Sequence, residues 1–157
     1  MRGVYTVSFD QQTIAAASGD YDFFEITPAD DRPCELVALD IGNKSEIGDA
    51  QEEFVAWGIF TDNTTSGNGT STTGVQVDPR DANPGFTAET VASTPASAGT
   101  AVRVWCSTFN LRSGLFIVLP ELIRPKVDQA DTMMCVRLLT ALADDATFSG
   151  TAFIREL

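Results

Sequence analysis

The sequence contains no histidine, and this absence excludes several kinds of active site. None of its 157 residues is His, so the chain by itself cannot build a Ser-His-Asp or a Cys-His nucleophile system. Zinc and non-haem iron sites that use histidine ligands are excluded for the same reason. We predict no catalytic, cofactor-binding or metal-binding residues, and we expect a protein that is not an enzyme.

Positive charge is also scarce in this chain. Ten Lys and Arg residues stand against 22 Asp and Glu, which gives a net charge of −12 and a pI of about 4.1. The basic residues are scattered, and only Arg124 and Lys126 lie close together. Nucleic-acid affinity comes mainly from basic side chains that neutralise phosphates, so we expect no nucleic-acid partner.

Long apolar runs are missing, and cysteine is rare. No run approaches the ~18 apolar residues typical of a membrane-spanning helix, and the first ten residues do not resemble a signal peptide. We therefore expect no membrane partner. The three cysteines, Cys34, Cys106 and Cys135, are odd in number and widely spaced, which favours buried reduced thiols over a disulfide framework. A bridge such as Cys34–Cys106 is the alternative.

The chain is rich in short runs of β-branched and aromatic residues separated by turn residues. Residues of opposite character alternate with period two in several of these runs, a pattern typical of strands. The predicted strands cover residues 4–9, 21–26, 34–41, 54–61, 101–109, 115–119, 133–142 and 147–154. A helix is the alternative for 133–142. The pattern predicts one all-β domain over residues 1–157, an antiparallel β-sandwich of jelly-roll type.

Two long connections interrupt this pattern. Residues 62–74 form a Gly/Ser/Thr-rich segment that we interpret as a flexible hairpin loop, since it lacks the Lys-Ser/Thr ending of a phosphate-binding loop. Residues 78–100 contain Phe86 and Val91 as the only large apolar side chains. Long loops in a compact domain are usually functional or disordered. Phe86 is expected either to anchor its loop or to contact a partner.

Acidic residues occur in small clusters, such as Asp30/Asp31, Asp128/Asp131 and Asp144/Asp145. Paired carboxylates serve glycoside hydrolysis in some proteins and bind calcium in others. Here they stand beside Pro, Gly or Ala, where Asp is favoured because its side chain bonds to nearby backbone. We interpret them as solvated turn residues, with calcium binding and catalysis as alternatives.

Several stretches of the sequence resemble small virion proteins of tailed bacteriophages. The matching stretches are YTVSFD, FFEITPADDRPCELVALDIGNKSEIGDAQEE, TTSGNGTSTTGVQVDPRDANPGFTAE, VASTPASAGTAV, LRSGLFIVLPELIRP and QADTMMCVRLLTALADDATFSGTAFIREL. The resemblance covers nearly the whole chain, and it implies a head-associated structural protein. It implies a capsid decoration (cement) protein that binds the major capsid protein lattice and stabilises the head. The implied location is the virion capsid surface, after assembly in the host cytoplasm.

A decoration protein needs surfaces that bind repeated capsid sites, commonly as a symmetric oligomer. We expect a homo-oligomer, a trimer or a dimer, that contacts its neighbours through exposed strand edges and long loops. Residues 1–9 and 78–100 are the segments least committed to one core. The predicted interface residues are Val4, Tyr5, Val7, Phe9, Phe86 and Val91.

Three alternative functions remain open at this point. The first is a different structural role, in a tail or a head fibre. The second is a carbohydrate-binding module on the virion, which an exposed row of aromatics on one sheet face would favour. The third is a hydrolase, which would require two carboxyl groups that converge in a cleft.

Overall fold

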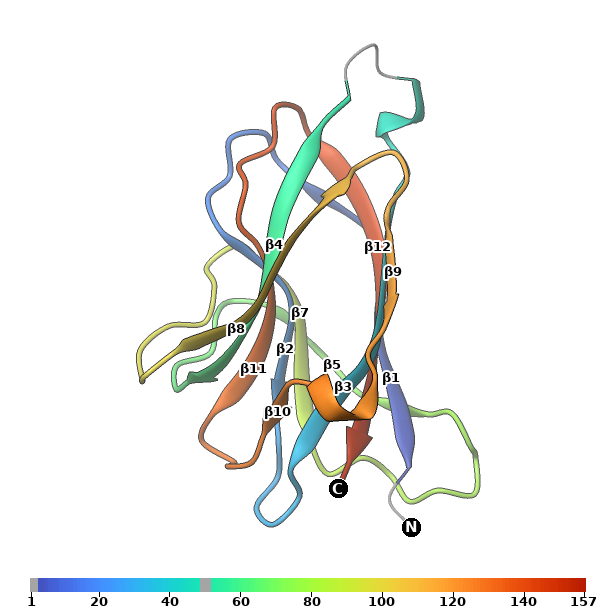
Figure 1. Ribbon diagram of the computed structural model, residues 1–157, viewed down its shortest axis with the longest axis vertical. Helices are drawn as coiled ribbons and strands as arrows, with labels where there is room; N and C mark the ends of the chain where they lie inside the picture. The colour runs from blue at the N-terminus through green and yellow to red at the C-terminus, as the bar shows by residue number, and fades with distance from the viewer. Residues whose placement is uncertain (1–2, 49–51) are drawn as a thin grey trace.

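The computed structural model describes residues 3–48 and 52–157, and strands make up most of this part of the chain (Figure 1). The strands are β1 (Val4–Ile14), β2 (Tyr21–Thr27), β3 (Cys34–Asn43), β4 (Phe54–Asn63), β5 (Thr70–Thr72), β6 (Val75–Gln76), β7 (Thr87–Ala92), β8 (Val102–Asn110), β9 (Leu115–Val118), β10 (Lys126–Val127), β11 (Met133–Leu138) and β12 (Ala146–Glu156). Two single-turn 3-10 helices, η1 (Glu46–Gly48) and η2 (Glu121–Ile123), complete the described elements.

All eight predicted strands are present, with changed ends. β1 continues to Ile14, and β11 stops at Leu138 instead of Leu142. The alternative helix over 133–142 is wrong, because β11 pairs with β2 on one side and with β4 on the other. A central strand covered on both faces is buried throughout, and this explains why the run does not alternate.

The strands form two antiparallel sheets that pack face to face as a sandwich. The first sheet, sheet A, has the order β10-β3-β12-β1-β6, with β9 also paired to β3. The second, sheet B, has the order β5-β7-β2-β11-β4-β8. In Figure 1 the strands β4, β8 and β11 lie on the left, and β9, β12 and β1 lie on the right. The all-β prediction and the antiparallel two-sheet arrangement are therefore confirmed.

Four of the strands fall in or near segments that the sequence pattern leaves unassigned. β5 and β7 extend sheet B beyond β2, and β6 pairs with β1 at the margin of sheet A. β10 pairs with the start of β3. The long connection over 78–100 therefore contributes a strand to sheet B.

A bulge in β2 decides which of its side chains face the core. Val136 of β11 pairs with Phe24, but the next residue, Arg137, pairs with Asp22. Phe23 is therefore the extra residue, and it shifts the alternation of side chains by one position. Both Phe23 and Phe24 reach the core, where each contacts the ring of Phe9, with centroids 6.1 Å and 5.3 Å away.

The core lies between the sheets and is rich in aromatic side chains. The inward-facing residues of β1, β3 and β12 meet those of β2, β4 and β11 in one cluster of buried side chains. Trp57 on β4 and Phe148 on β12 are almost fully buried there. Buried apolar area of this kind is the main source of stability in a domain without disulfides.

Candidate functional site

The six residues predicted to form an interface do not make an exposed surface. The buried residues are Tyr5, Val7, Phe9 and Phe86, and the half-buried ones are Val4 and Val91. Their apolar character reflects packing in the core of this chain. The described structure therefore leaves the four buried side chains no surface for a partner, which corrects the choice of interface residues.

The first strand is also not an edge of its sheet. β1 pairs with β12 along its length, from Val4–Arg155 to Ile14–Ala146, and with β6 at Tyr5 and Thr6. The backbone groups of β1 that face β12 are paired along the strand, and β6 covers part of its other side. Met1 and Arg2, which belong to the same predicted contact segment, lie outside the described residues.

Phe86 anchors the long segment to which it belongs. Its ring packs edge-on against Tyr5, with centroids 5.6 Å apart, and only 5% of the residue is exposed. The backbone N–H groups of Gly85 and Phe86 both donate to Oε1 of Glu156, at 2.6 Å and 3.0 Å. Burial, and then the nearby Glu156, raise the pKa of Tyr5. Of the two interpretations of Phe86, the loop anchor is the one observed.

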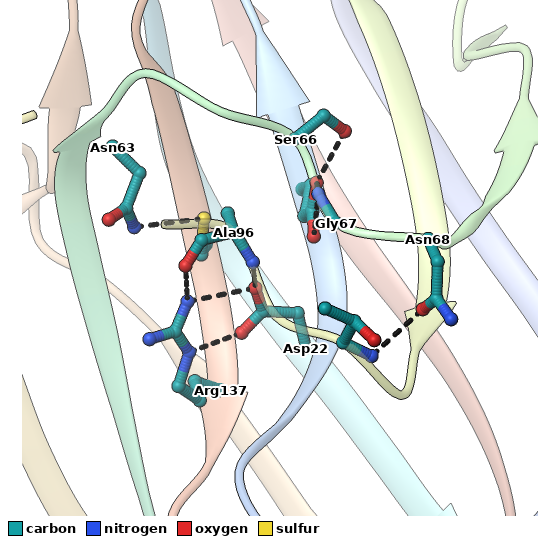
Figure 2. Close-up of polar contacts among 10 residues, drawn as sticks. Asp22, Asn63, Ser66, Gly67, Asn68, Ala96 and Arg137 are labelled. Carbon is teal, nitrogen blue, oxygen red and sulfur yellow. Dashed lines mark hydrogen bonds and ion pairs between the residues drawn. The ribbon is translucent and has the colours of Figure 1, made fainter. Parts of the chain in front are cut away.

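A buried ion pair lies on the outer face of sheet B (Figure 2). Arg137 donates from Nε and Nη2 to the carboxylate of Asp22, the second at 2.9 Å, and from Nη2 to the carbonyl of Ala96 at 2.8 Å. The N–H of Ala96 returns a hydrogen bond to Asp22 at 2.7 Å. The Arg137 guanidinium also lies over the ring of Phe60, 4.8 Å from its centroid. Each charged group thus has a partner, as burial requires.

Glu25, three residues after Asp22, reaches the same outer face because of the β2 bulge. It accepts hydrogen bonds from Ser66 Oγ at 2.9 Å and from the N–H of Gly67 at 3.0 Å (Figure 2). Burial raises the pKa of Glu25, and the Asp22 charge adds to this, whereas the bonds from Gly67 and Ser66 oppose it. The two carboxylates are at most 2% exposed.

These carboxylates fasten two loops to sheet B. Residues 63–69 and 93–98 are bonded to each other as well, since Thr65 and Ser97 exchange backbone hydrogen bonds and Asn68 Oδ1 accepts from the N–H of Thr94. The interpretation of residues 62–74 as a free, flexible hairpin is therefore corrected. The segment has no apolar anchor, but it has polar ones.

The cysteines occupy two different environments. All three are free thiols, and Cys34 and Cys135 are buried as predicted. Burial raises the pKa of Cys34 to about 12 and raises that of Cys135 as well. The prediction of burial is wrong for Cys106, which is exposed on β8. Because β8 ends its sheet, its outward side chains have no covering layer.

A shallow polar groove crosses the outer face of sheet A. It has a volume of about 380 Å³, and its lining includes Ser8, Asp10, Asp40, Gly42, Ser149 and Thr151. The register places Ser8 of β1, Thr151 of β12, Asp40 of β3 and Phe116 of β9 in one straight row. Phe116, at the end of this row, is 68% exposed.

The exposed apolar side chains gather in one part of the chain. Six of the ten large hydrophobic residues that are exposed in the described structure belong to residues 102–123: Val102, Val104, Phe116, Val118, Leu122 and Ile123. β8 and β9 are terminal strands of their sheets, and the turn at 111–114 joins them directly. We call Val102, Val104, Val118, Leu122 and Ile123 the β8–η2 side.

The charge of this region differs from that of the rest of the chain. Residues 102–126 hold four of the ten basic residues (Arg103, Arg112, Arg124 and Lys126) and one of the 22 acidic ones, Glu121. Their net charge is therefore +3, and the remaining residues sum to −15. This imbalance is visible in the sequence, and it is the signal that could have located the region before the fold was known.

Three of the molecule's cations surround a single buried carboxylate next to this region. Glu35, fully buried on β3, pairs with Arg124 at 2.7 Å, Arg155 at 2.7 Å and Lys126 at 3.5 Å. Arg155 also pairs with Glu121 at 2.9 Å. The arrangement compensates Glu35 fully and leaves excess positive charge near η2.

An open acidic pocket lies at one end of the sandwich. It has a volume of about 430 Å³ and is lined by Asp30, Asp31, Asp128 and Asp131, from the β2–β3 and β10–β11 loops. Over residues 3–48 and 52–157, however, no group of three or more His, Cys, Asp or Glu side chains has an arrangement that could hold a metal ion.

Comparison with protein-family models and with curated proteins identified no relative of this chain. No protein-family model matches the chain, and no curated protein matches its sequence. In the described residues, no helix is both long and apolar enough to span a membrane.

Proposed function

We propose that this chain is a non-enzymatic decoration (cement) protein of a tailed-bacteriophage head, located on the capsid surface and bound to the major capsid protein. The observation that carries the proposal is the β8–η2 side, where exposed apolar side chains coincide with the one region of positive charge. Large apolar side chains exposed on a folded chain are typical of protein–protein contacts. Leu122, 99% exposed, has no packing role in the described chain.

The order of strands supports the jelly-roll type that viral capsid domains use. Without the short strands β5, β6, β7 and β10, the eight that remain are ordered β1-β12-β3-β9 and β2-β11-β4-β8. In chain order this is 1-8-3-6 facing 2-7-4-5, the pattern produced by two interlocked Greek keys. The same architecture serves lectin domains, so the order of strands does not by itself distinguish attachment from sugar binding.

The free edge of β8 supports attachment by strand addition. β8 is nine residues long and pairs only with β4, so its other row of backbone N–H and C=O groups is open. Arg103 is its single charged residue. Native edge strands usually carry charges or are covered, and an uncovered apolar edge is suited to a strand from a neighbouring protein. This edge replaces β1 as the expected contact strand.

Attachment of this kind favours an acidic contact on the capsid and a symmetric arrangement of copies. Arg103 and the cations around Glu35, which exceed Glu35 and Glu121 by one positive charge, complement negative charge, whereas two such surfaces repel one another. The capsid lattice is therefore favoured over a second copy as the occupant of the β8–η2 side. The proposed trimer or dimer would form around a capsid symmetry axis through other surfaces.

The test is binding to heads assembled from the major capsid protein of the phage that carries this chain. Wild-type protein is expected to co-sediment with these heads in a saturable manner, and Leu122→Asp combined with Ile123→Asp to weaken binding at least about tenfold. Val77→Asp is the matched control, because Val77 is 58% exposed but lies beyond β6, at the opposite edge of sheet A. Wild-type protein that fails to bind, or equal loss in both variants, would contradict the proposal.

A further inference from the structure

The groove on the outer face of sheet A is a consequence of small and missing side chains. Gly42 has none, and a Cβ atom built on it would meet nothing within 4 Å. Its neighbours across β12 and β1 are the short side chains Ser149, Thr151 and Ser8. The outer face of the sheet is thereby hollowed over two adjoining rows, Gly42–Ser149 and Asp40–Thr151–Ser8, and Phe116 stands at the end of the second row.

Hydrogen-bonding groups of complementary kinds line this groove. Ser149 Oγ donates to Asp10 Oδ1 at 2.7 Å, and the hydroxyls of Ser8 and Thr151 lie 3.0 Å apart. Asp40, exposed at the centre of the row, has no hydrogen-bond or ion-pair partner among the described residues. The groove thus offers two carboxylates as acceptors and hydroxyls that both donate and accept.

Phe116 supplies the apolar part of the same row. It pairs directly with Asp40 across β3 and β9, so its ring and the Asp40 carboxylate project from neighbouring positions on one face. At 68% exposed, the ring has no covering side chain. A flat apolar ring beside carboxylate and hydroxyl groups matches a pyranose, whose C–H face is apolar and whose rim carries hydroxyl donors.

We propose that this groove binds a neutral saccharide, with the sugar ring against Phe116 and its hydroxyls donating to Asp40 and Asp10. The absence of any basic residue from the lining disfavours anionic sugars, as does the net charge of −12. The groove lining shares no residue with the β8–η2 side, but Phe116 lies two positions from Val118 on the same face of β9, so the two surfaces adjoin. This inference does not rest on the proposed decoration function.

The probes are maltotetraose, cellotetraose and chitotetraose, titrated by calorimetry and by NMR. At least one is expected to bind saturably at concentrations below about 10 mM, an affinity typical of a small open site. Phe116→Ala and Asp40→Asn are each expected to weaken binding about tenfold or more. Both side chains are exposed, so neither change should alter the unfolding temperature.

Phe54→Ala is the matched control, because Phe54 is a 62% exposed aromatic at the start of β4, on the other sheet. It should leave saccharide affinity unchanged. Absence of saturable binding for all three saccharides would overturn the proposal, as would equal affinity in wild type and Phe116→Ala. So would a response to calcium chloride alone, since it would assign the two carboxylates to a cation. Asp40→Asn should still bind capsid heads, which separates failure of this site from failure of the attachment function.

Discussion

At the scale of single residues, the described structure concentrates charge where burial makes it costly. Asp22, Glu25 and Arg137 project from sheet B beneath two loops, and Glu35 lies buried among three cations. Removing one partner of a buried ion pair lowers the stability far more than replacing both partners by apolar residues, because the remaining charge is left without compensation. The consequences can be measured separately at Arg137 and at Glu25.

Replacement of Arg137 by Met should destabilise the protein strongly. Asp22 would remain fully buried without its cation, and the carbonyl of Ala96 would lose its donor, at an expected cost of about 3–5 kcal/mol in the free energy of unfolding. Urea denaturation measures this. Arg80→Met is the control, since the Arg80–Asp78 pair is exposed on the surface and its loss should not be measurable. Similar effects of the two changes would contradict the account of the buried pair.

The raised pKa of Glu25 predicts a particular pH dependence. In the folded state Glu25 binds its proton more tightly than in the unfolded state, where the pKa of Glu25 is near 4.5. The contribution of Glu25 is therefore most favourable below that pH and is lost as the pH rises through the folded pKa. Relative to wild type, Glu25→Gln should gain stability as the pH rises from about 4.5 towards neutral. A constant difference between the two unfolding free energies would refute this.

At the scale of elements, two irregular features determine what the regular strands do. The bulge at Phe23 turns both acidic residues of β2 outward, and the loops 63–69 and 93–98 run antiparallel to each other above them. Gly67 lies where the two loops meet, and a Cβ atom there would come 2.1 Å from the carbonyl oxygen of Thr94 and 2.5 Å from Glu25 Oε1. Only glycine allows the backbone to approach this closely.

Gly67→Ala should therefore loosen both loops together. The expected loss is about 1–3 kcal/mol in the free energy of unfolding, with faster amide exchange confined to residues 63–69 and 93–98. Hydrogen-exchange mass spectrometry distinguishes this local effect from global destabilisation. Gly19→Ala is the control, because a Cβ atom at Gly19 meets nothing within 4 Å. Unchanged amide exchange in both loops would show that the contact between them does not depend on Gly67.

At the scale of the whole molecule, the uneven distribution of charge is the property most relevant to attachment. Residues 102–126 carry +3, while the rest of the chain carries −15. Such a dipolar arrangement orients a protein as it approaches an acidic surface. It also keeps the remaining surface soluble and repels copies that meet in other orientations.

Binding to capsid heads should weaken as salt rises, if the positive region makes the contact. Between about 0.05 M and about 0.5 M NaCl the screening length falls severalfold, so the apparent Kd should rise steadily. Arg103→Gln should reduce this salt dependence. Leu122→Ser should instead lower the affinity while leaving the salt dependence unchanged, because it removes apolar contact only. Affinity that is independent of salt in the wild type would exclude an electrostatic contribution from this region.

The sequence by itself determined the class of fold. Period-two alternation in runs such as 4–9 reports directly which residues face the core, since a strand has only two faces, and the eight strands followed from it. The same reasoning chose buried core residues as interface residues, because apolar residues in a terminal strand look alike whether they fill a core or meet a partner.

Only the tertiary structure decided which strands end the sheets, which loops are anchored and where the groove lies. These features depend on pairing between distant segments, such as β1 with β12 and Phe116 with Asp40, and local patterns carry no record of that pairing. The bulge in β2 shows the physical reason most clearly. One extra residue reverses the facing of every side chain beyond it, and its presence is set by the partner strand, not by the residues of β2 alone.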